Sequence, residues 1–236
     1  FGLVSMDVML ADVGLRDLLD WSTDQSLYSA QLHGTFLGSL SYQDRIQPFT
    51  VKTEEKADIA FEGYQGSDSF ENKEWAYLGT SKPVTVKSEK GDLTVGEIDL
   101  DIKANATFAE MLETSLYDSD SKINLRTLVF SDKTSDTKVQ LDNFYLAALS
   151  AVDADKGVAN VGITYGVDAL TANDFTAKDL ALSLEINNIS NAFLEAYKNA
   201  APEFSKGSTE QVQAKMQQFF ENNLLAVVAA EPQINI

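Results

Sequence analysis

The chain contains one histidine, His33, and no cysteine, so two common sources of catalytic and metal-binding side chains are nearly missing. A histidine base needs a neighbouring nucleophile and an orienting carboxylate, and no Gly-x-Ser-x-Gly motif supplies the nucleophile. With one histidine and no thiolate, a zinc site would have to be built from carboxylates. We therefore interpret His33 as an ordinary surface or loop-covered histidine.

Asp99 and Asp101 lie two positions apart on one face of an expected strand, so their carboxylates are neighbours. Paired carboxylates carry out glycoside hydrolysis, and they are the best-placed pair for such a reaction here. Because the chain has 36 acidic residues, pairs of this kind also arise by chance. We favour a solvated sheet face and keep a carboxylate-based carbohydrate-active enzyme as the weakest alternative.

Two acidic stretches, 118–120 and 153–157, have the alternate oxygen ligands of calcium loops. The EF-hand pattern fails in the second stretch, since Lys156 precedes Gly157 and Thr164 occupies the twelfth position. We predict polar turns, with no metal site and no cofactor. The glycosylation triplets at 105–107 and 188–190 are near chance for this length.

Four aromatic side chains, Trp21, Trp75, Phe144 and Tyr145, have the chemistry to line an apolar groove. Core packing is the more common role of such residues, and it is the interpretation that we favour.

Alternation of apolar and polar residues predicts strands over most of residues 3–189. The expected strands are 3–10, 27–42, 46–53, 58–64, 75–78, 84–88, 93–108, 123–130, 139–151, 157–170 and 175–189. The segment 12–21 has a short helical pattern, 108–117 is ambiguous, and the polar segment 65–74 indicates a loop. In 93–108 apolar and polar residues alternate cleanly, which is typical of an antiparallel sheet with one buried and one wet face.

The period changes to helical at Ser190. A first helix is expected over 190–200, interrupted by Pro202 and Gly207. Ser208 and Gln211 have capping-box spacing at the start of a second helix. An apolar stripe from Val212 to Leu225 would pack against the sheet.

The predicted fold class is α+β and mainly β, a long twisted antiparallel sheet with a C-terminal helical pair packed on one face. We expect one elongated soluble domain over 1–236, with antiparallel strands over 1–189, the helical pair over 190–225 and a closing strand over 226–236.

The charge balance limits the classes of partner. Lys and Arg total 18 against 36 Asp and Glu, which gives a net charge of −18. Nucleic acids and anionic headgroups are bound by clustered positive charge, so neither is an expected partner. The longest nearly continuous apolar run, 224–230, is too short to span a bilayer.

Several stretches carry a family resemblance. They are 161–170, 179–186, the helical residues Phe193, Tyr197 and 212–225, the closing stretch 229–236 and, with a weaker pattern, 28–49. In element order and apolar pattern they resemble the YdgA-like family of bacterial envelope proteins of unknown function. The resemblance implies a periplasmic protein of Gram-negative bacteria held at the inner membrane by an anchor that this chain lacks, so that the chain is a middle fragment. It implies no catalytic residues.

These observations favour a non-enzymatic envelope protein that acts by binding. Its partner would be another protein or a second copy of the chain, joined through an unpaired sheet edge into a homodimer. The alternative is a carrier of lipid or another apolar ligand in a groove between sheet and helices.

Overall fold

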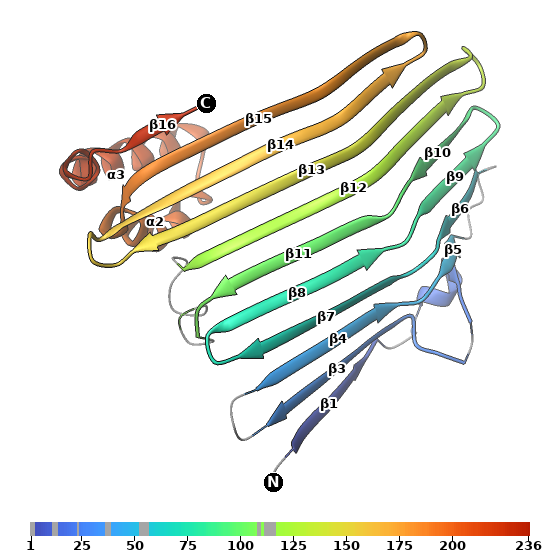
Figure 1. Ribbon diagram of the computed structural model, residues 1–236, viewed down its shortest axis with the longest axis horizontal. Coiled ribbons are helices and arrows are strands. Elements are labelled where there is room, and N and C mark those ends of the chain that lie inside the picture. The colour runs from blue at the N-terminus through green and yellow to red at the C-terminus, as the bar shows by residue number, and fades with distance from the viewer. Residues whose placement is uncertain are drawn as a thin grey trace. The chain divides into compact units, whose positions relative to one another are not determined.

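The computed structural model describes residues 3–10, 14–22, 24–35, 39–51, 57–107, 110 and 117–236. Antiparallel strands follow one another in chain order and two helices precede the last strand (Figure 1). The strands are β1 Leu3–Met9, β2 Leu19–Asp20, β3 Tyr28–Thr35, β4 Leu40–Ile46, β5 Phe49–Val51, β6 Ala57–Phe61, β7 Tyr64–Glu71, β8 Glu74–Ser81, β9 Val84–Ser88, β10 Gly91–Val95, β11 Ile98–Asn105, β12 Asp118–Asp132, β13 Thr137–Asp153, β14 Val158–Ala172, β15 Phe175–Ser190 and β16 Gln233–Asn235. The helices are the short η1 Leu15–Asp17, α2 Asn191–Phe204 and α3 Thr209–Ala229. The predicted fold class is confirmed.

Some neighbouring strands that carry separate labels belong to one continuous hydrogen-bonded ladder. Tyr64 pairs with Ser81 and Phe61 pairs with Val84. Between these pairs the Lys82 amide donates to the Gly63 carbonyl and the Glu62 amide donates to the Pro83 carbonyl. The antiparallel register therefore runs without a shift from β7–β8 into β6–β9.

Equivalent interruptions occur at residues 47–48, 62–63, 82–83 and 96–97, which we call the break line. Pro48 and Pro83 have no amide hydrogen for the ladder, and Gly63 has a φ of 108°, so regular strand geometry stops at these points. Because the register continues across each interruption, β4 with β5, β6 with β7, β8 with β9 and β10 with β11 are four long bent strands.

Apolar side chains change face at the break line. Ile46, Ile98 and Leu100 lie at even positions on one side of it, whereas Phe49 and Leu93 lie at odd positions on the other. Side chains alternate between faces along a strand, so the apolar set moves to the opposite face. The prediction of one buried and one wet face is confirmed at 103–106, where Ala104 and Ala106 are buried and Lys103 and Asn105 are exposed. It is wrong over 93–102, where most residues of both faces are partly exposed.

Several predicted boundaries need correction. The segment 27–42 is two strands, β3 and β4, rather than one. The polar segment 65–74, expected to be a loop, forms β7 and the start of β8, because polar side chains are tolerated on a sheet whose faces are both partly wet. The helical pattern at 12–21 yields only η1 and β2 among described residues. Most of the ambiguous segment 108–117 lies outside the described residues.

The helical pair extends further than predicted. α2 continues through Pro202 to Phe204, although Pro202 has no amide hydrogen to donate within the helix, and α3 continues to Ala229 instead of ending at residue 225. The closing strand shortens accordingly to Gln233–Asn235. The predicted capping box is confirmed, with the Ser208 hydroxyl and the Gln211 side chain each accepting from the other's backbone amide.

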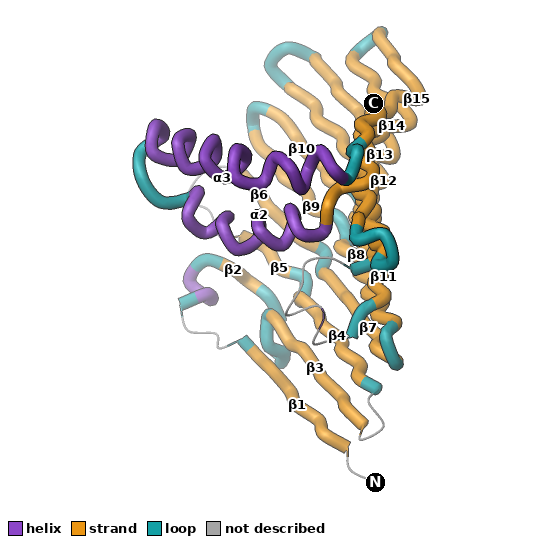
Figure 2. The backbone as a smooth tube through the Cα atoms, turned by 90° about the vertical axis from the view of Figure 1, so that its left-hand side faces the viewer, coloured by secondary structure: helices purple, strands orange, loops and turns teal. Residues whose placement is uncertain are grey.

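The chain divides into two compact units. Unit 1 comprises residues 1–103, 121–147 and 164–182, and unit 2 comprises 104–120, 148–163 and 183–236. In unit 2 the helices lie on one side of the strand ends (Figures 1 and 2). Among the described residues no large side chain is less than 2% exposed, so the sheet has no deeply enclosed core.

Replacing Gly96 with alanine should destabilise unit 1. A Cβ atom at this position would lie 2.5 Å from the Thr127 Oγ1 atom and 2.9 Å from the Thr127 carbonyl oxygen of the neighbouring strand. Overpacking of this kind costs about 1–3 kcal/mol. Urea denaturation followed by circular dichroism should show a lower midpoint for Gly96→Ala.

The matched control is Gly162→Ala in β14, where the nearest heavy atom would lie 3.6 Å from the new Cβ, an ordinary contact. Equal midpoints for the two variants would contradict the close approach of β12 to Gly96.

Candidate functional site

A cavity of about 830 Å³ lies in unit 1 on one face of β1, β3, β4, β7 and β8, which we call the pocket face. Its lining is mainly polar and mostly uncharged. The lining glutamines, Gln25, Gln31, Gln43, Gln47 and Gln65, are all the glutamines among the first 139 residues of the chain. The hydroxyl groups of Ser26, Ser29, Ser67 and Thr80 come from the same segments.

Strand register places these side chains in cross-strand rows. Gln31 of β3 pairs with Gln43 of β4, and Arg45 of β4 pairs with Gln65 of β7. Gln65 in turn pairs with Thr80 of β8. Directly paired residues share a face of the sheet, with Cβ atoms about 5 Å apart, so the rows form one continuous polar surface.

Trp21 fixes one wall of the pocket. The side chain is 5% exposed, and its indole N–H donates to the Gln25 carbonyl at 3.0 Å. The Arg16 guanidinium lies 3.8 Å from the ring centre and donates to the Trp21 carbonyl. These contacts hold Gln25 and Ser26 beside the strands.

The glutamine amides of the pocket are available to a ligand. Gln31, Gln43 and Gln65 are exposed, and within the described ranges their side chains make no hydrogen bond to the protein. Each primary amide offers two donors and one acceptor oxygen. The pocket therefore has unused capacity for hydrogen bonds of both directions.

A second polar arrangement lies on the opposite face of the same strands, which we call the tyrosine face. The Tyr28 and Tyr42 hydroxyls are 2.7 Å apart, and the Tyr64 and Tyr77 hydroxyls also form a hydrogen bond. The Tyr77 hydroxyl donates to the Asp44 carboxylate at 3.1 Å. These bonds tie β3, β4, β7 and β8 together across the sheet.

Neighbouring residues complete this layer. The Trp75 indole donates to Asp68 Oδ2 at 2.9 Å, and the Trp75 and Tyr77 rings stack. Gly66 lies beneath the Tyr77 hydroxyl, where a Cβ atom would collide with it. Most polar groups of the layer bond to one another, but Asp68 Oδ1 is buried without a hydrogen-bond partner among the described residues. We interpret the layer as a structural network.

Burial sets the titration of this layer. Burial, followed by the hydrogen bond between Tyr42 and Tyr28, raises the pKa of Tyr42, and burial with the Tyr64 hydrogen bond raises the pKa of Tyr77. Burial also raises the pKa of Asp44, an effect that the Tyr77 hydrogen bond opposes. Tyr42 and Tyr77 therefore stay protonated near neutral pH.

Asp99 and Asp101 do not form a free catalytic pair. Arg126 donates to Asp99 at 3.0 Å and Thr80 donates to it at 3.1 Å. Lys103 donates to Asp101 at 3.2 Å. Each carboxylate therefore has a cation partner within the sheet, although Asp101 Oδ1 is buried without a hydrogen-bond partner among the described residues.

Arg126 also pairs with Glu97 at 2.6 Å, and Lys82 pairs with the same carboxylate. The Lys82 hydrogen bond, followed by Arg126, lowers the pKa of Glu97. This network spans β8, β11 and β12 at the break line, where the regular ladder is interrupted. It stabilises the sheet locally and is screened by salt because it is exposed.

The other sequence candidates lie apart. His33 is exposed on β3 and pairs with Ser5 and Ser41. The prediction of a polar turn at 118–120 is wrong, because these residues begin β12 and Asp118 accepts from the Val152 amide of β13. At 153–157 the predicted polar turn is confirmed, and Asp153 accepts there from the backbone and side chain of Lys156. In the described part of the chain no three His, Asp or Glu side chains come together as metal ligands.

The four aromatic candidates do not converge. Trp21 is buried beside η1, whereas Trp75 belongs to the tyrosine face of β8. Tyr145 lies on β13, with the Lys122 ammonium 5.2 Å from its ring centre. Trp21 is confirmed as a packed residue, and no groove shared with Phe144 is seen among the described residues.

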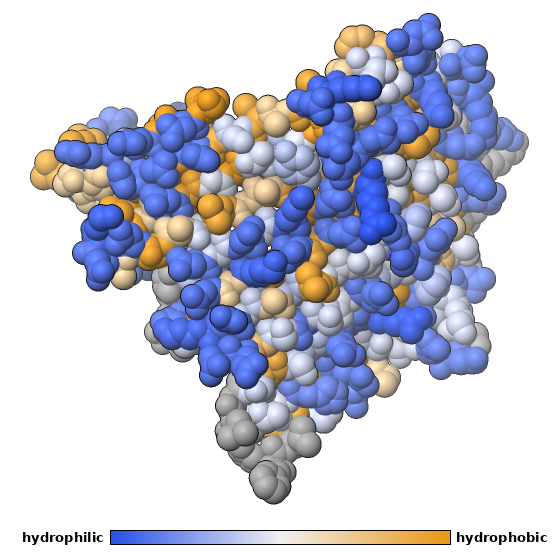
Figure 3. Space-filling model, in the orientation of Figure 1, coloured by the Kyte–Doolittle hydropathy of each residue, from blue (hydrophilic) through white to orange (hydrophobic). Residues whose placement is uncertain are grey.

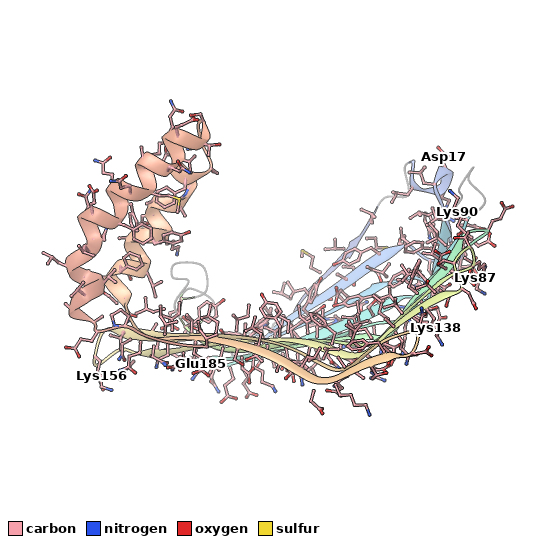
Figure 4. All side chains as sticks on the ribbon, turned by 90° about the horizontal axis from the view of Figure 1, so that it is seen from above. Asp17, Lys87, Lys90, Lys138, Lys156 and Glu185 are labelled. Carbon is pink, nitrogen blue, oxygen red and sulfur yellow. The ribbon has the colours of Figure 1, made fainter. Side chains whose placement is uncertain are left out.

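Unit 2 has its own apolar contacts. Phe193 of α2 packs against Phe219 and Phe220 of α3, with ring centres 5.5 and 5.9 Å apart. A groove of about 460 Å³ lies between the end of α3 and the strand ends. Its lining residues are Lys156, Gly157, Val158, Asn188, Ser190, Ala226, Ala229 and Ala230. Lys156 and Glu185 project from the other side of these strands, away from the helices (Figure 4).

β15 presents an open edge. It pairs with β14 on one side and, on the other, only Glu185–Asn187 pair with β16. Over 175–182 no described strand covers this side, and Phe175, Leu180 and Leu182 are 64%, 45% and 60% exposed. Apolar side chains are visible among hydrophilic ones along this margin (Figure 3).

Sequence reasoning overlooked the glutamine rows. Alternation over 27–42 puts Gln31 at a polar position, but alternation alone does not distinguish a binding surface from a solvated one. The available signal was compositional, because uncharged amides recur on polar faces of a strongly charged chain. Their meeting in one pocket depends on a register that the sequence does not give.

Comparison with known proteins identifies a family. The family model described as a bacterial protein of unknown function (DUF945) matches residues 2–236. No curated protein and no solved structure matches. The expectation of a bacterial family of unknown function is confirmed. In the described ranges no helix has the length and apolar character needed to cross a membrane.

The substitution Asp44→Asn should alter the pH dependence of stability. Since burial raises the pKa of Asp44, the folded chain keeps this proton to a higher pH than the unfolded chain. Between the two pKa values the free energy of unfolding of the wild type therefore falls as pH rises. Asparagine removes this titration and keeps an oxygen that accepts from Tyr77.

The variant should gain stability relative to the wild type from about pH 4 upward, the ordinary range of aspartate, and the gain should then level off. Urea midpoints measured across this range give the difference. Asp58→Asn, at an exposed position on β6, is the control. A pH-independent difference for Asp44→Asn would contradict the role assigned to burial.

Proposed function

The chain belongs to the DUF945 family of bacterial proteins of unknown function, and from this premise we propose that it is a non-enzymatic envelope protein that acts by binding. The observation that carries the proposal is the open edge of β15. An exposed edge with apolar side chains is a template for another strand.

The occupant that fits this edge is a second copy of the chain. Over 175–182 the only charged residues are Lys178 and Asp179, so the segment is neutral although the chain carries −18. Two copies can approach here without the repulsion that acts elsewhere on the surface. Antiparallel pairing of β15 with itself about a two-fold axis closes after two subunits.

Asp179 limits how far such pairing extends. Its φ of 53° interrupts the extended backbone within the open edge. Irregularities of this type restrict indiscriminate edge pairing in natural sheets. We therefore place the contact on the C-terminal side of Asp179, where Leu180 and Leu182 share a face.

The envelope location belongs to the same proposal. It is supported by the resemblance in the stretches 161–170 and 179–186 and by the bacterial family match. We propose a periplasmic domain that is held at the inner membrane through a segment outside this chain. Fractionation of cells expressing the full-length protein tests it, and recovery in the cytosolic fraction would contradict it.

A carrier function is the second candidate, favoured by the groove of unit 2. Three alanines and Val158 give the groove an apolar wall, which suits an acyl chain. Native mass spectrometry of gently extracted protein should reveal a bound lipid if this function is correct. Absence of lipid, together with no uptake of a fluorescent fatty acid, would exclude it.

Introducing lysine at the open edge should prevent dimerisation. In Leu182→Lys each copy would place a charge in the contact, where like charges oppose one another and lysine disfavours edge pairing. Light scattering after size exclusion should show a concentration-dependent dimer for the wild type and a monomer for the variant.

Leu78→Lys is the matched control, because Leu78 is 56% exposed but lies on β8, inside the sheet. This variant should dimerise like the wild type. A wild type that stays monomeric at high concentration would exclude the second copy, and recovery with a different protein on the intact edge would identify a heterologous partner.

A further inference from the structure

We propose that the polar pocket of unit 1 is a saccharide-binding site, a function that is independent of the β15 edge. The pocket is about 830 Å³, within the size range of small-molecule sites. Its walls come from the 24–26 segment and from β1, β3, β4, β7 and β8, so it is a built surface rather than one flexible loop.

The hydrogen-bonding pattern selects a polyhydroxylated ligand. A sugar hydroxyl donates one hydrogen bond and accepts others, and a glutamine amide does both through two donors and an acceptor oxygen. Gln31, Gln43 and Gln65 offer such amides in adjacent rows, with the Ser29, Ser67 and Thr80 hydroxyls between them.

The choice of residue types supports this interpretation over a solvated face. Charged residues line the pocket about as often as they occur in the chain, since Asp7, Asp24, Asp44 and Arg45 are among the lining residues and charged residues make up 23% of the sequence. What distinguishes the lining is glutamine, because every glutamine of the first 139 residues lies here. Leu78, paired with Ser67 and 56% exposed, supplies an apolar surface for the C–H face of a sugar ring.

Other ligand classes fit less well. An acyl chain would leave the amides without partners, which costs free energy for each polar group that is buried unpaired. A peptide strand pairs through its backbone with a sheet edge, whereas most of this pocket lies on the face of β3, β4, β7 and β8, where side chains are presented, and only residues 7–9 come from the end strand β1. A nucleic acid would require clustered positive charge, and Arg45 is the one basic residue that lines the pocket.

Arg45 lies between Ser29 and Gln65 in the pocket, and within the described residues it has no carboxylate partner at ion-pair distance. Its guanidinium presents a fork of donors that binds either neighbouring sugar hydroxyls or a sugar carboxylate. We assign it the role of orienting the sugar in the pocket.

The test is a glycan array followed by isothermal titration of the protein with triacetylchitotriose and with trigalacturonate, one neutral and one acidic trisaccharide. Binding of at least one array glycan or trisaccharide with a dissociation constant below about 1 mM is expected. The double variant Gln31→Ala/Gln43→Ala should weaken it at least about tenfold, because two amides that bind the sugar are lost. Both side chains are exposed, so the variant should keep the unfolding midpoint of the wild type.

Gln213→Ala on α3 is the matched control, since Gln213 is an exposed glutamine outside the pocket, and it should bind like the wild type. Arg45→Gln separates the two ligand types, with a larger loss for trigalacturonate if Arg45 binds a carboxylate. Absence of any glycan hit, equal binding by the Gln31→Ala/Gln43→Ala variant, or selection of a peptide in place of a glycan would each overturn the proposal.

Discussion

One hydrogen-bond register holds the long strands of unit 1 in a single sheet, although four of them are interrupted. At the interruptions at 62–63, 82–83 and 96–97, backbone bonds continue the flanking ladders, as between Gly63 and Lys82 and between Gly96 and Thr127. Since the ladder never shifts, alternation is preserved and every side chain keeps an assigned face. The pocket rows, the tyrosine layer and the ion pairs of Arg126 all depend on this one register.

Much of this architecture could be predicted from local pattern. Alternation located most strands, and the Ser208–Gln211 spacing identified the start of α3. These predictions succeed because the patterns that they use lie within a few neighbouring residues. The prediction for 65–74 failed for a physical reason, since Gly, Ser and Asp are turn formers in isolation but lie in β7 under cross-strand pairing.

The candidate site was much less accessible to sequence reasoning. Gln31, Gln43 and Gln65 each occupy an ordinary polar position in a strand, and their meeting is a property of pairing across three strands. Titratable pairs such as Asp99 and Asp101 attracted attention because their chemistry is visible along the chain. The cation that compensates Asp99 is Arg126, which is distant in sequence and is brought close only by the fold. The cation that compensates Asp101 is Lys103, only two residues away along the chain.

The pocket face and the tyrosine face are two sides of the same strands, and this back-to-back placement has an evolutionary consequence. Inserting or deleting one residue in β4 would turn Tyr42 and Asp44 toward the pocket and Gln43 toward the phenols. The amides and the phenol network would then be lost together, whatever compensation occurred elsewhere. Changes of chain length within this strand should therefore be rarer among descendants of the gene than replacements of single side chains.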